Sequence, residues 1–374
     1  MTEPSLIASP HAHAPRSVGS LMGLVLLALL PATLFGLYLF GWPALFLFAV
    51  TIAAALGFEA LALLLAGRPV RDTLLDGSAL LTGWLLALTL PPWAPWWIGV
   101  LGGFLAVVLG KQVFGGIGQN LFNPAMVARV ALLISFPLEM TRFVTPAPLF
   151  SAGAPDLPQA LAITFGGGDP TATWDAFSGA SLLGQVRTGL SSGLSTGDGP
   201  ALADLLAGAY DPLAALLGLV PGSLGETSAL LLLAGGLLLI ARRAIDWAIP
   251  LAVLGSLALL ATGMHLLAPD QHPGPLYHLL SGSAMLCAFF IATDPVTSPV
   301  SRAGQALFGV GVGVLIYVIR TWGGYPEGVA FAVLLMNACT PMIDHYLRPR
   351  VYGRDRRGQP LEYPAADRPS EPGR

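Results

Sequence analysis

The chain has 374 residues, of which 54% are hydrophobic and only 10% are charged, and its formal net charge is −3. Soluble globular domains carry about 25% charged residues, so the composition excludes an ordinary soluble protein, and the small net charge gives no indication of nucleic-acid binding. The two cysteines, Cys287 and Cys339, lie in apolar runs and imply no disulfide framework. We predict an all-α, polytopic membrane protein.

Hydropathy predicts about ten transmembrane helices. They lie near residues 20–40, 43–66, 76–91, 95–112, 123–138, 226–241, 246–265, 276–293, 303–320 and 327–344. The first 16 residues are polar and lack a signal-peptide cleavage pattern, so we expect the first apolar run to be retained. These spans divide the chain into an N-terminal tail (1–19), a first five-helix repeat (20–138), a long loop (139–225), a second five-helix repeat (226–346) and a disordered tail (347–374).

The positions of Lys and Arg predict the orientation of the chain in the membrane. With the N-terminus in the cytoplasm, the basic residues that face inside are Arg16, Arg68, Arg71, Lys111, Arg242, Arg243, Arg302 and those of the C-terminal tail. Arg142, Arg187 and Arg320 lie outside, and Arg129 falls within the fifth span. We therefore expect a bacterial inner-membrane protein with both termini in the cytoplasm and the long loop on the outer face.

An internal repeat accompanies this division. Residues 77–87 and 282–292 share five identities in eleven positions, and each segment then runs into a proline. Each segment belongs to the third helix of a five-helix half. Because five is odd, the halves would insert in opposite orientations, as inverted repeats in transporter-like folds do. The alternative is that small residues recur in any packed helix bundle.

The first block with chemical potential covers residues 110–125. Gly115 and Gly116 permit a tight, non-helical turn between the fourth and fifth spans. Asn120 and Asn123 offer amide donors and acceptors, and Asn123 with the proline after it can open the fifth span. Lys111 stands at the start of the block. The block is either a capped interhelical turn or that same turn presenting its backbone to a flavin or an ion.

The second block lies in the long loop, where residues 175–181 read D-A-F-S-G-A-S. This pattern, with Asp175, Ser178, Gly179, Ala180 and Ser181, resembles the sequence on which flavin transferases build a phosphoester between FMN and a hydroxyl side chain. Ser181 supplies an accessible hydroxyl, and the small residues before it let an enzyme approach the backbone closely. The alternative is a flexible loop that happens to be small and polar.

The third block, residues 292–299, is interrupted by Pro295 and Pro299, which leave backbone carbonyls free. Irregular backbone at membrane depth is tolerated where it lines a cavity or is buried in protein. Asp294 and Thr297 are therefore candidates to bind a cation or the edge of a flavin ring. The alternative is a cytoplasmic connector capped by Asp294.

Three ionisable residues fall inside predicted spans: Glu59, Arg129 and Asp344. Intramembrane charges are functional candidates, but a structural Glu–Arg pair and snorkelling to an interface explain them equally simply. We favour these structural roles for all three.

Several ring side chains lie near the outer face. We interpret Trp322 and Tyr325 as interfacial aromatics. His265, His272 and His278 surround one short outer loop, where exposure to solvent is expected. We predict no metal site.

Six segments, in order and spread over nearly the whole chain, resemble the D component of the Rnf electron transport complex, also called Rsx. That component is a relative of the B component of the sodium-pumping NADH:quinone reductase. The segments lie at residues 76–83, 110–125, 175–181, 222–229, 292–299 and 322–337.

The resemblance implies a polytopic subunit with FMN attached covalently on an outward-facing loop, at Ser181. The family usually has threonine at this point, and serine supplies the same hydroxyl. A second, non-covalent flavin (riboflavin) is also implied. We place it at the inner face, beside Lys111, the glycines of the first block and residues 294–298.

The resemblance also implies a function and partners. The chain would be the membrane subunit of an ion-translocating oxidoreductase complex that couples electron transfer between ferredoxin and nicotinamide pools to ion transport. Its partners would be components like A, B, C, E and G, and a flavin transferase would mature it. No dinucleotide fingerprint is present, so nicotinamide would bind another component. The rival interpretations are a solute channel or transporter without a redox role, and a structural membrane anchor.

Overall fold

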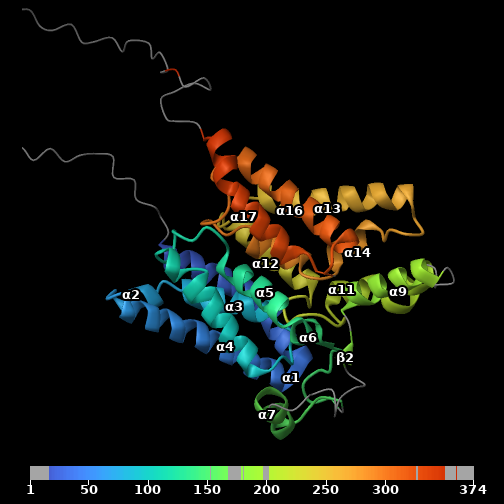
Figure 1. The fold of residues 1–374 in the computed structure, drawn as a ribbon, viewed down its shortest axis with the longest axis horizontal. Coiled ribbons are helices and arrows are strands. Elements are labelled where there is room, and N and C mark those ends of the chain that lie inside the picture. Colours follow the sequence, from blue (N-terminus) through green and yellow to red (C-terminus); the bar gives the residue numbers. More distant parts are fainter. Residues whose placement is uncertain are drawn as a thin grey trace, which may run out of the picture.

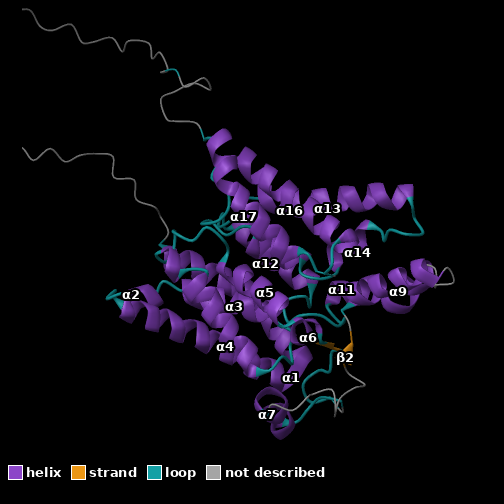
Figure 2. Cartoon of the chain, in the orientation of Figure 1, coloured by secondary structure: helices purple, strands orange, loops and turns teal. Residues whose placement is uncertain are grey.

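A computed structural model of the chain describes residues 17–151, 153–166, 178–179, 181–196, 202–325, 327–349 and 359. Almost all regular structure in this part of the chain is helical (Figure 2). The two short strands described there, β1 (Phe143–Val144) and β2 (Ser178–Gly179), pair antiparallel. The predicted all-α class is confirmed.

The first half begins with α1 (Val18–Leu65), a long helix whose backbone breaks at Gly41. Gly41 has φ 73°, a left-handed conformation that glycine adopts without steric cost. The helices that follow are α2 (Val70–Leu74), α3 (Ser78–Thr89), α4 (Trp96–Phe104), the π-helical η1 (Leu105–Leu109), the 3-10 helix η2 (Gln112–Phe114) and α5 (Pro124–Ser135).

The segment predicted as one long loop contains short helices. They are α6 (Pro137–Thr141), α7 (Leu157–Phe165), α9 (Leu182–Thr196), α10 (Leu202–Ala209) and α11 (Pro212–Leu217). Local capping explains the start of α7, because Asp156 and Gln159 form a reciprocal capping box there. Hydropathy detects only long apolar runs, so it missed these helices.

The second half contains α12 (Ala229–Ala241), α13 (Ala248–Leu267), α14 (Pro275–Leu280), α15 (Ala284–Leu286), the π-helical η3 (Cys287–Ile291), α16 (Arg302–Trp322) and α17 (Val329–Tyr346). The predicted eighth span is thus broken into α14, α15 and η3, with Gly282 in a left-handed conformation between the first two. The other predicted spans match observed helices within a few residues.

Four helices of the described chain are long and apolar enough to cross a bilayer. They are α1, the continuous segment Trp96–Phe114, α13 and α16. Three shorter apolar helices, α3, α5 and α12, accompany them. This pattern is that of a helical membrane protein.

The helices form two groups that meet along α5 and α12. Figure 1 shows α1, α3 and α4 on one side and α13, α16 and α17 on the other. α12 packs against α1, and α17 packs against both α5 and α16. Glycines permit the closest approaches: a Cβ on Gly309 of α16 would lie 2.9 Å from the carbonyl oxygen of Ile249 on α13. Small residues at helix crossings are typical of packing in membranes.

Candidate functional site

Lys111 is buried and forms an ion pair. Its Nζ donates hydrogen bonds to Glu59 Oε1 at 2.6 Å and to Ser78 Oγ at 2.7 Å. The Ser78 hydroxyl donates in turn to Asp76 Oδ1 at 2.5 Å. Only 2% of Lys111 and 0% of Glu59 is exposed. We call Glu59, Ser78 and Lys111 the lysine cluster.

The expected Glu–Arg pair is wrong for Glu59, whose partner is Lys111. The reason is the close packing of α4 on the second part of α1. A Cβ on Gly103 would lie 3.0 Å from the backbone nitrogen of Ala55, so the two helices approach closely at this level. The next turns of each helix bring Lys111 level with Glu59.

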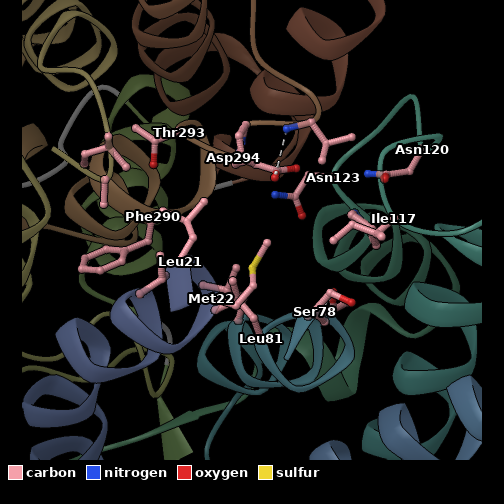
Figure 3. A pocket seen from close by; sticks show the side chains of 18 of the residues that line it. Leu21, Met22, Ser78, Leu81, Ile117, Asn120, Asn123, Phe290, Thr293 and Asp294 are labelled. Atoms are coloured by element: carbon pink, nitrogen blue, oxygen red, sulfur yellow. Dashed lines mark hydrogen bonds between the residues drawn. The ribbon is translucent and has the colours of Figure 1, made fainter. Parts of the chain in front are cut away.

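A cavity of about 80 Å³ lies beside the lysine cluster (Figure 3), and we call it the lysine cavity. Its polar lining is Ser78, Lys111, Asn120, Asn123, Thr293 and Asp294. Figure 3 shows Asn123 and Asp294 on one side, with Met22 and Leu81 across from them. Four residues predicted as cofactor-binding (Lys111, Asn120, Asn123 and Asp294) therefore meet at one cavity between the two halves.

Asn123 joins the two halves and caps α5. Its side-chain oxygen accepts from the backbone nitrogens of the first turn of α5, as predicted from the Asn-Pro pair. Its Nδ2 donates to the Ile291 carbonyl at 3.3 Å, and its backbone nitrogen donates to Asn337 Oδ1 at 3.1 Å. Asn337 also donates to the Thr297 carbonyl at 3.1 Å. The end of η3, the start of α5 and the middle of α17 are thus held at one point.

Asp294 acts as a turn cap and also lines the lysine cavity. Its Oδ2 accepts from the Thr297 hydroxyl at 3.0 Å, and its Oδ1 accepts from the Val296 backbone nitrogen at 3.4 Å. Thr297 itself does not line the cavity. The two interpretations made from the sequence, cap and ligand, are therefore compatible for Asp294.

The glycines of the first block shape the turn and stand back from the cavity. Gly115 and Gly116 have φ values of 114° and 100°, which confirms the predicted non-helical backbone. The Gly115 carbonyl accepts from Arg68 Nη1 at 2.6 Å. Neither glycine lines the lysine cavity.

Ser181 starts α9 and is buried. Its Oγ accepts from the Gly184 backbone nitrogen at 3.3 Å, and only 8% of the residue is exposed. The accessible hydroxyl that we expected is thus covered in this fold. Ser178 and Gly179 form β2, which pairs with β1. Asp175 and Ala180 lie outside the described residues.

A second cavity, of about 20 Å³, lies beside Ser181, and we call it the serine cavity. Arg129, Glu226 and Glu327 line it together with Ser181 and Tyr325. We call Arg129, Glu226 and Glu327 the arginine cluster. Only 6% of Arg129 is exposed, and within the described chain its Nη1 has no hydrogen-bond partner. The sequence analysis did not single out Glu226 or Glu327, although both lie in segments that matched the family.

Glu327 is anchored by Arg320. Arg320 Nη2 contacts Glu327 Oε1 at 3.2 Å and donates to the Ser281 carbonyl at 3.0 Å, while Nη1 donates to the His278 carbonyl at 2.6 Å. Glu327 Oε2 also accepts from the Ser283 backbone nitrogen at 3.3 Å. Arg320 thereby satisfies the carbonyls freed where the eighth span breaks.

Burial raises the pKa of Glu226 to about 7, and the negative charge of Glu327 acts in the same direction. Arg129 opposes this shift. Glu226 lies in the loop that precedes α12, outside the membrane-length helices. Its carboxyl group therefore changes charge near neutral pH.

Arg187 ties α9 to the turn after α16. Its Nη1 donates to the Tyr325 carbonyl at 2.8 Å, and its Nη2 contacts the Gly323 carbonyl. Since Ser181 begins α9 and Tyr325 lines the serine cavity, this clamp closes the cavity from the side of the long loop.

Other sequence expectations have mixed outcomes. His278 is buried, with 4% exposed, so its predicted exposure to solvent is wrong; it lies under Tyr277 and Tyr317. Trp322 is 60% exposed, in agreement with an interfacial position. Asp344 accepts from the Val300 backbone nitrogen at 3.0 Å, a structural role as favoured from the sequence.

The family model described as NQR2, RnfD, RnfE matches residues 5–353. The chain belongs to the NQR2, RnfD, RnfE family. This membership confirms the resemblance to the D component that six sequence segments indicated. With its membrane-length helices, it makes the chain a multi-pass membrane protein.

Three relatives within the NQR2, RnfD, RnfE family are named as the D component of an ion-translocating oxidoreductase complex. The chain is 59% identical to the protein of Halorhodospira halophila over 95% of its own length and 97% of the relative's. It is 56% identical to that of Stutzerimonas stutzeri, over 92% and 95% of the two chains. With that of Rhodobacter capsulatus the identity is 51%, over 84% of each.

Proposed function

We propose that this chain is the membrane subunit of an ion-translocating oxidoreductase complex and carries FMN on Ser181. The complex would couple electron transfer between ferredoxin and nicotinamide pools to ion transport. The observation that carries the proposal is the place of Ser181, a hydroxyl beside a buried arginine within a motif of the expected pattern. The similarity to relatives named as D components supports it. No complete activity is expected from this chain alone.

The residues around Ser181 suit a covalently bound phosphate. Ser181 Oγ would be the phosphoester oxygen, and the N-terminal turn of α9 lies directly beside it. Arg129 would lie on the other side of the serine cavity. Bound FMN supplies one- and two-electron transfer. The protein's own contribution is to hold that group in place and to surround it with fixed charges.

The covalent flavin can be tested directly. A denaturing gel of the purified chain, illuminated with ultraviolet light, should show a fluorescent band. A digest should give one Ser181 peptide whose mass is raised by FMN less water. Ser181→Ala should abolish this adduct while the protein still inserts. An unchanged adduct in Ser181→Ala would refute the assignment, and a dark band from the unaltered chain would favour a channel, a transporter or an anchor.

The proposal includes about ten spans in two inverted five-helix repeats, with both termini in the cytoplasm. α1 has 48 residues, which at 1.5 Å per residue is about 72 Å, more than twice the hydrocarbon thickness of a bilayer. Its break at Gly41 therefore suits two crossings. Gly77 and Gly282, at matching positions of the two halves, both adopt positive φ (79° and 66°).

A second parallel supports the repeat. Lys111 and Arg320 each stand at the end of the fourth helix of their half. Lys111 bonds Ser78, and Arg320 bonds Ser281, beside the related glycines.

The proposed topology places the segment 139–225 outside the inner membrane and the segments 1–19 and 347–374 inside. Cysteines introduced at Ser191 and Arg357 should react with an impermeant reagent from opposite sides of the membrane. Reaction from the same side would refute the even number of spans and the inverted repeat together.

We further propose that the lysine cavity is the place of a second, non-covalent flavin of the riboflavin type. Its amide and carboxylate groups (Asn120, Asn123 and Asp294) suit the polar edge of a flavin ring, and its apolar walls suit the ring faces. Lys111 is already paired with Glu59, so it would contribute as a neutralised donor rather than a free charge. Asp294→Ala should lower the flavin released on denaturation and leave the Ser181 adduct intact. Unaltered flavin release with a lower folding yield would reduce Asp294 to a cap.

The partners would be the other components of the complex, like A, B, C, E and G, and a flavin transferase. Purification of the tagged chain from its membrane should retain these components. A chain that purifies alone, with flavin, would contradict the assembly and leave the flavin assignment in place.

A further inference from the structure

Arg129 is a buried cation with an unused hydrogen-bond donor. It lies on α5, 6% exposed, and in the described chain it forms no hydrogen bond and no ion pair within 4 Å. Buried charges are normally paired, because the loss of hydration is costly otherwise. Arg129 therefore requires an anionic partner or a compensating one nearby.

The carboxylates of the arginine cluster do not fill this role by direct contact. Glu327 is held by Arg320 at 3.2 Å and by the Ser283 backbone nitrogen at 3.3 Å. Glu226 Oε2 accepts from the Ser223 backbone nitrogen at 3.3 Å. Both carboxylates act on Arg129 only through the cavity between them. The guanidinium is thus kept charged and in position without being saturated.

The other wall of the serine cavity is also suited to an anion. Ser181 caps α9, a helix of 15 residues, so the free backbone N–H groups and the positive end of the helix dipole lie next to its hydroxyl. A helix N-terminus is a ready site for phosphate. The buried, unpartnered Arg129 that lines the same cavity is an independent indication of a ligand.

We propose that Arg129 and the first turn of α9 form the seat of the phosphodiester that links Ser181 to its flavin. This inference rests on the proposed covalent flavin. A phosphodiester carries one negative charge, which would complete the pairing of Arg129 through charge-assisted hydrogen bonds. Glu226 faces the same cavity and would compete with the phosphodiester for Arg129 when ionised.

The test uses the full chain, produced with its complex and a flavin transferase and purified in detergent. The variants are Arg129→Gln and Arg129→Lys, with Arg302→Gln as the control. Arg302 forms an exposed ion pair with Asp246, and its side chain is 76% exposed. Peptide mass measures the adduct. Fluorescence anisotropy and quenching by acrylamide, an uncharged quencher, measure how firmly the attached flavin is held.

Arg129→Gln should retain the adduct but shift the equilibrium between seated and free phosphodiester by about tenfold to a hundredfold, as expected for loss of a charged hydrogen bond. Anisotropy would then fall and quenching would rise. Arg129→Lys should give an intermediate result, because lysine keeps the charge without the planar fork. Arg302→Gln should match the unaltered chain.

Glu226→Gln separates this role from a structural one. If Arg129 seats the phosphodiester, removing the competing carboxylate leaves anisotropy unchanged or raises it. If Arg129 only balances Glu226, then Glu226→Gln loosens the flavin as much as Arg129→Gln does, and the proposal is wrong.

Two further outcomes also decide. An intact adduct in Arg129→Gln with the anisotropy of the control overturns this inference alone, whereas no adduct in the unaltered chain overturns the covalent flavin as well. If Arg129→Gln does not fold, Arg129→Lys decides instead: anisotropy equal to that of the unaltered chain would refute the seat.

Discussion

The lysine cluster and the arginine cluster each bury a basic residue, yet they treat it differently. Lys111 is hydrogen-bonded to both Glu59 and Ser78, whereas Arg129 has two carboxylates near it and a hydrogen bond to neither. The first arrangement is complete within the polypeptide. The second is kept charged but has capacity for another partner. Burial of a cation is thus no indication of ligand binding by itself; the state of its hydrogen bonds is what distinguishes the two sites.

Breaking the complete pair should have the largest effect. Glu59→Ala leaves the Lys111 ammonium buried without its counter-ion, which should destabilise the chain by about 3–5 kcal/mol. Thermal unfolding of the detergent-purified protein measures this. Asp246→Ala removes one partner of an exposed pair with Arg302, so it should cost no more than about 1 kcal/mol. Equal losses for the two variants would contradict the contrast between a buried and an exposed pair.

The related glycines offer a second, smaller comparison. Gly77→Ala places a Cβ 3.3 Å from Met22 Cβ, so the cost is mainly the left-handed backbone, about 1–2 kcal/mol. Gly282→Ala adds clashes with Glu327 and Arg320, and with Leu183 Cδ1 at 2.8 Å, worth about 1–3 kcal/mol more.

Unfolding midpoints measure both glycine variants. Flavin anisotropy should change only in Gly282→Ala, because Leu183 belongs to α9. A flavin loosened by Gly77→Ala instead would show that the two halves are coupled more tightly than these contacts imply.

The pH dependence of stability should report Glu226. Its pKa is about 7 in the folded chain and near 4.5 otherwise, so the folded state binds more protons between these values. The stabilisation is complete below pH 4.5 and is lost as pH rises through 7, at most about 1.4 kcal/mol per pH unit.

Unfolding midpoints between pH 5 and 8 should therefore fall in the unaltered chain and flatten in Glu226→Gln. Glu327 and Arg129 face the same group. An identical slope in the variant would assign the titration to another residue.

The sequence predicted the helices better than the contacts between them. Long apolar runs and the Asn123 cap are local features, and both are confirmed. The Lys111–Glu59 pair joins residues 52 apart, and it depends on how closely α4 packs on α1, which hydropathy does not encode.

The candidate site shows the same limit. The motif around Ser181 marked a position but gave no neighbours. Arg129 was visible as an intramembrane charge, and Glu226 and Glu327 were visible only as letters inside longer matching segments. Their meeting depends on the break of the eighth span and on the folding of the long loop back onto the helices. That folding also buries Ser181, which small flanking residues had suggested would be accessible.

The clamp made by Arg187 has a consequence for biogenesis. Its carbonyl partners lie 136 and 138 residues further along the chain. At roughly 5–20 residues per second, the ribosome needs on the order of ten seconds to produce them after Arg187. Throughout that interval the segment with Ser181 has already been made and nothing holds it shut. A modifying enzyme thus meets an open hydroxyl in the growing chain, and completion of the polypeptide ends the opportunity.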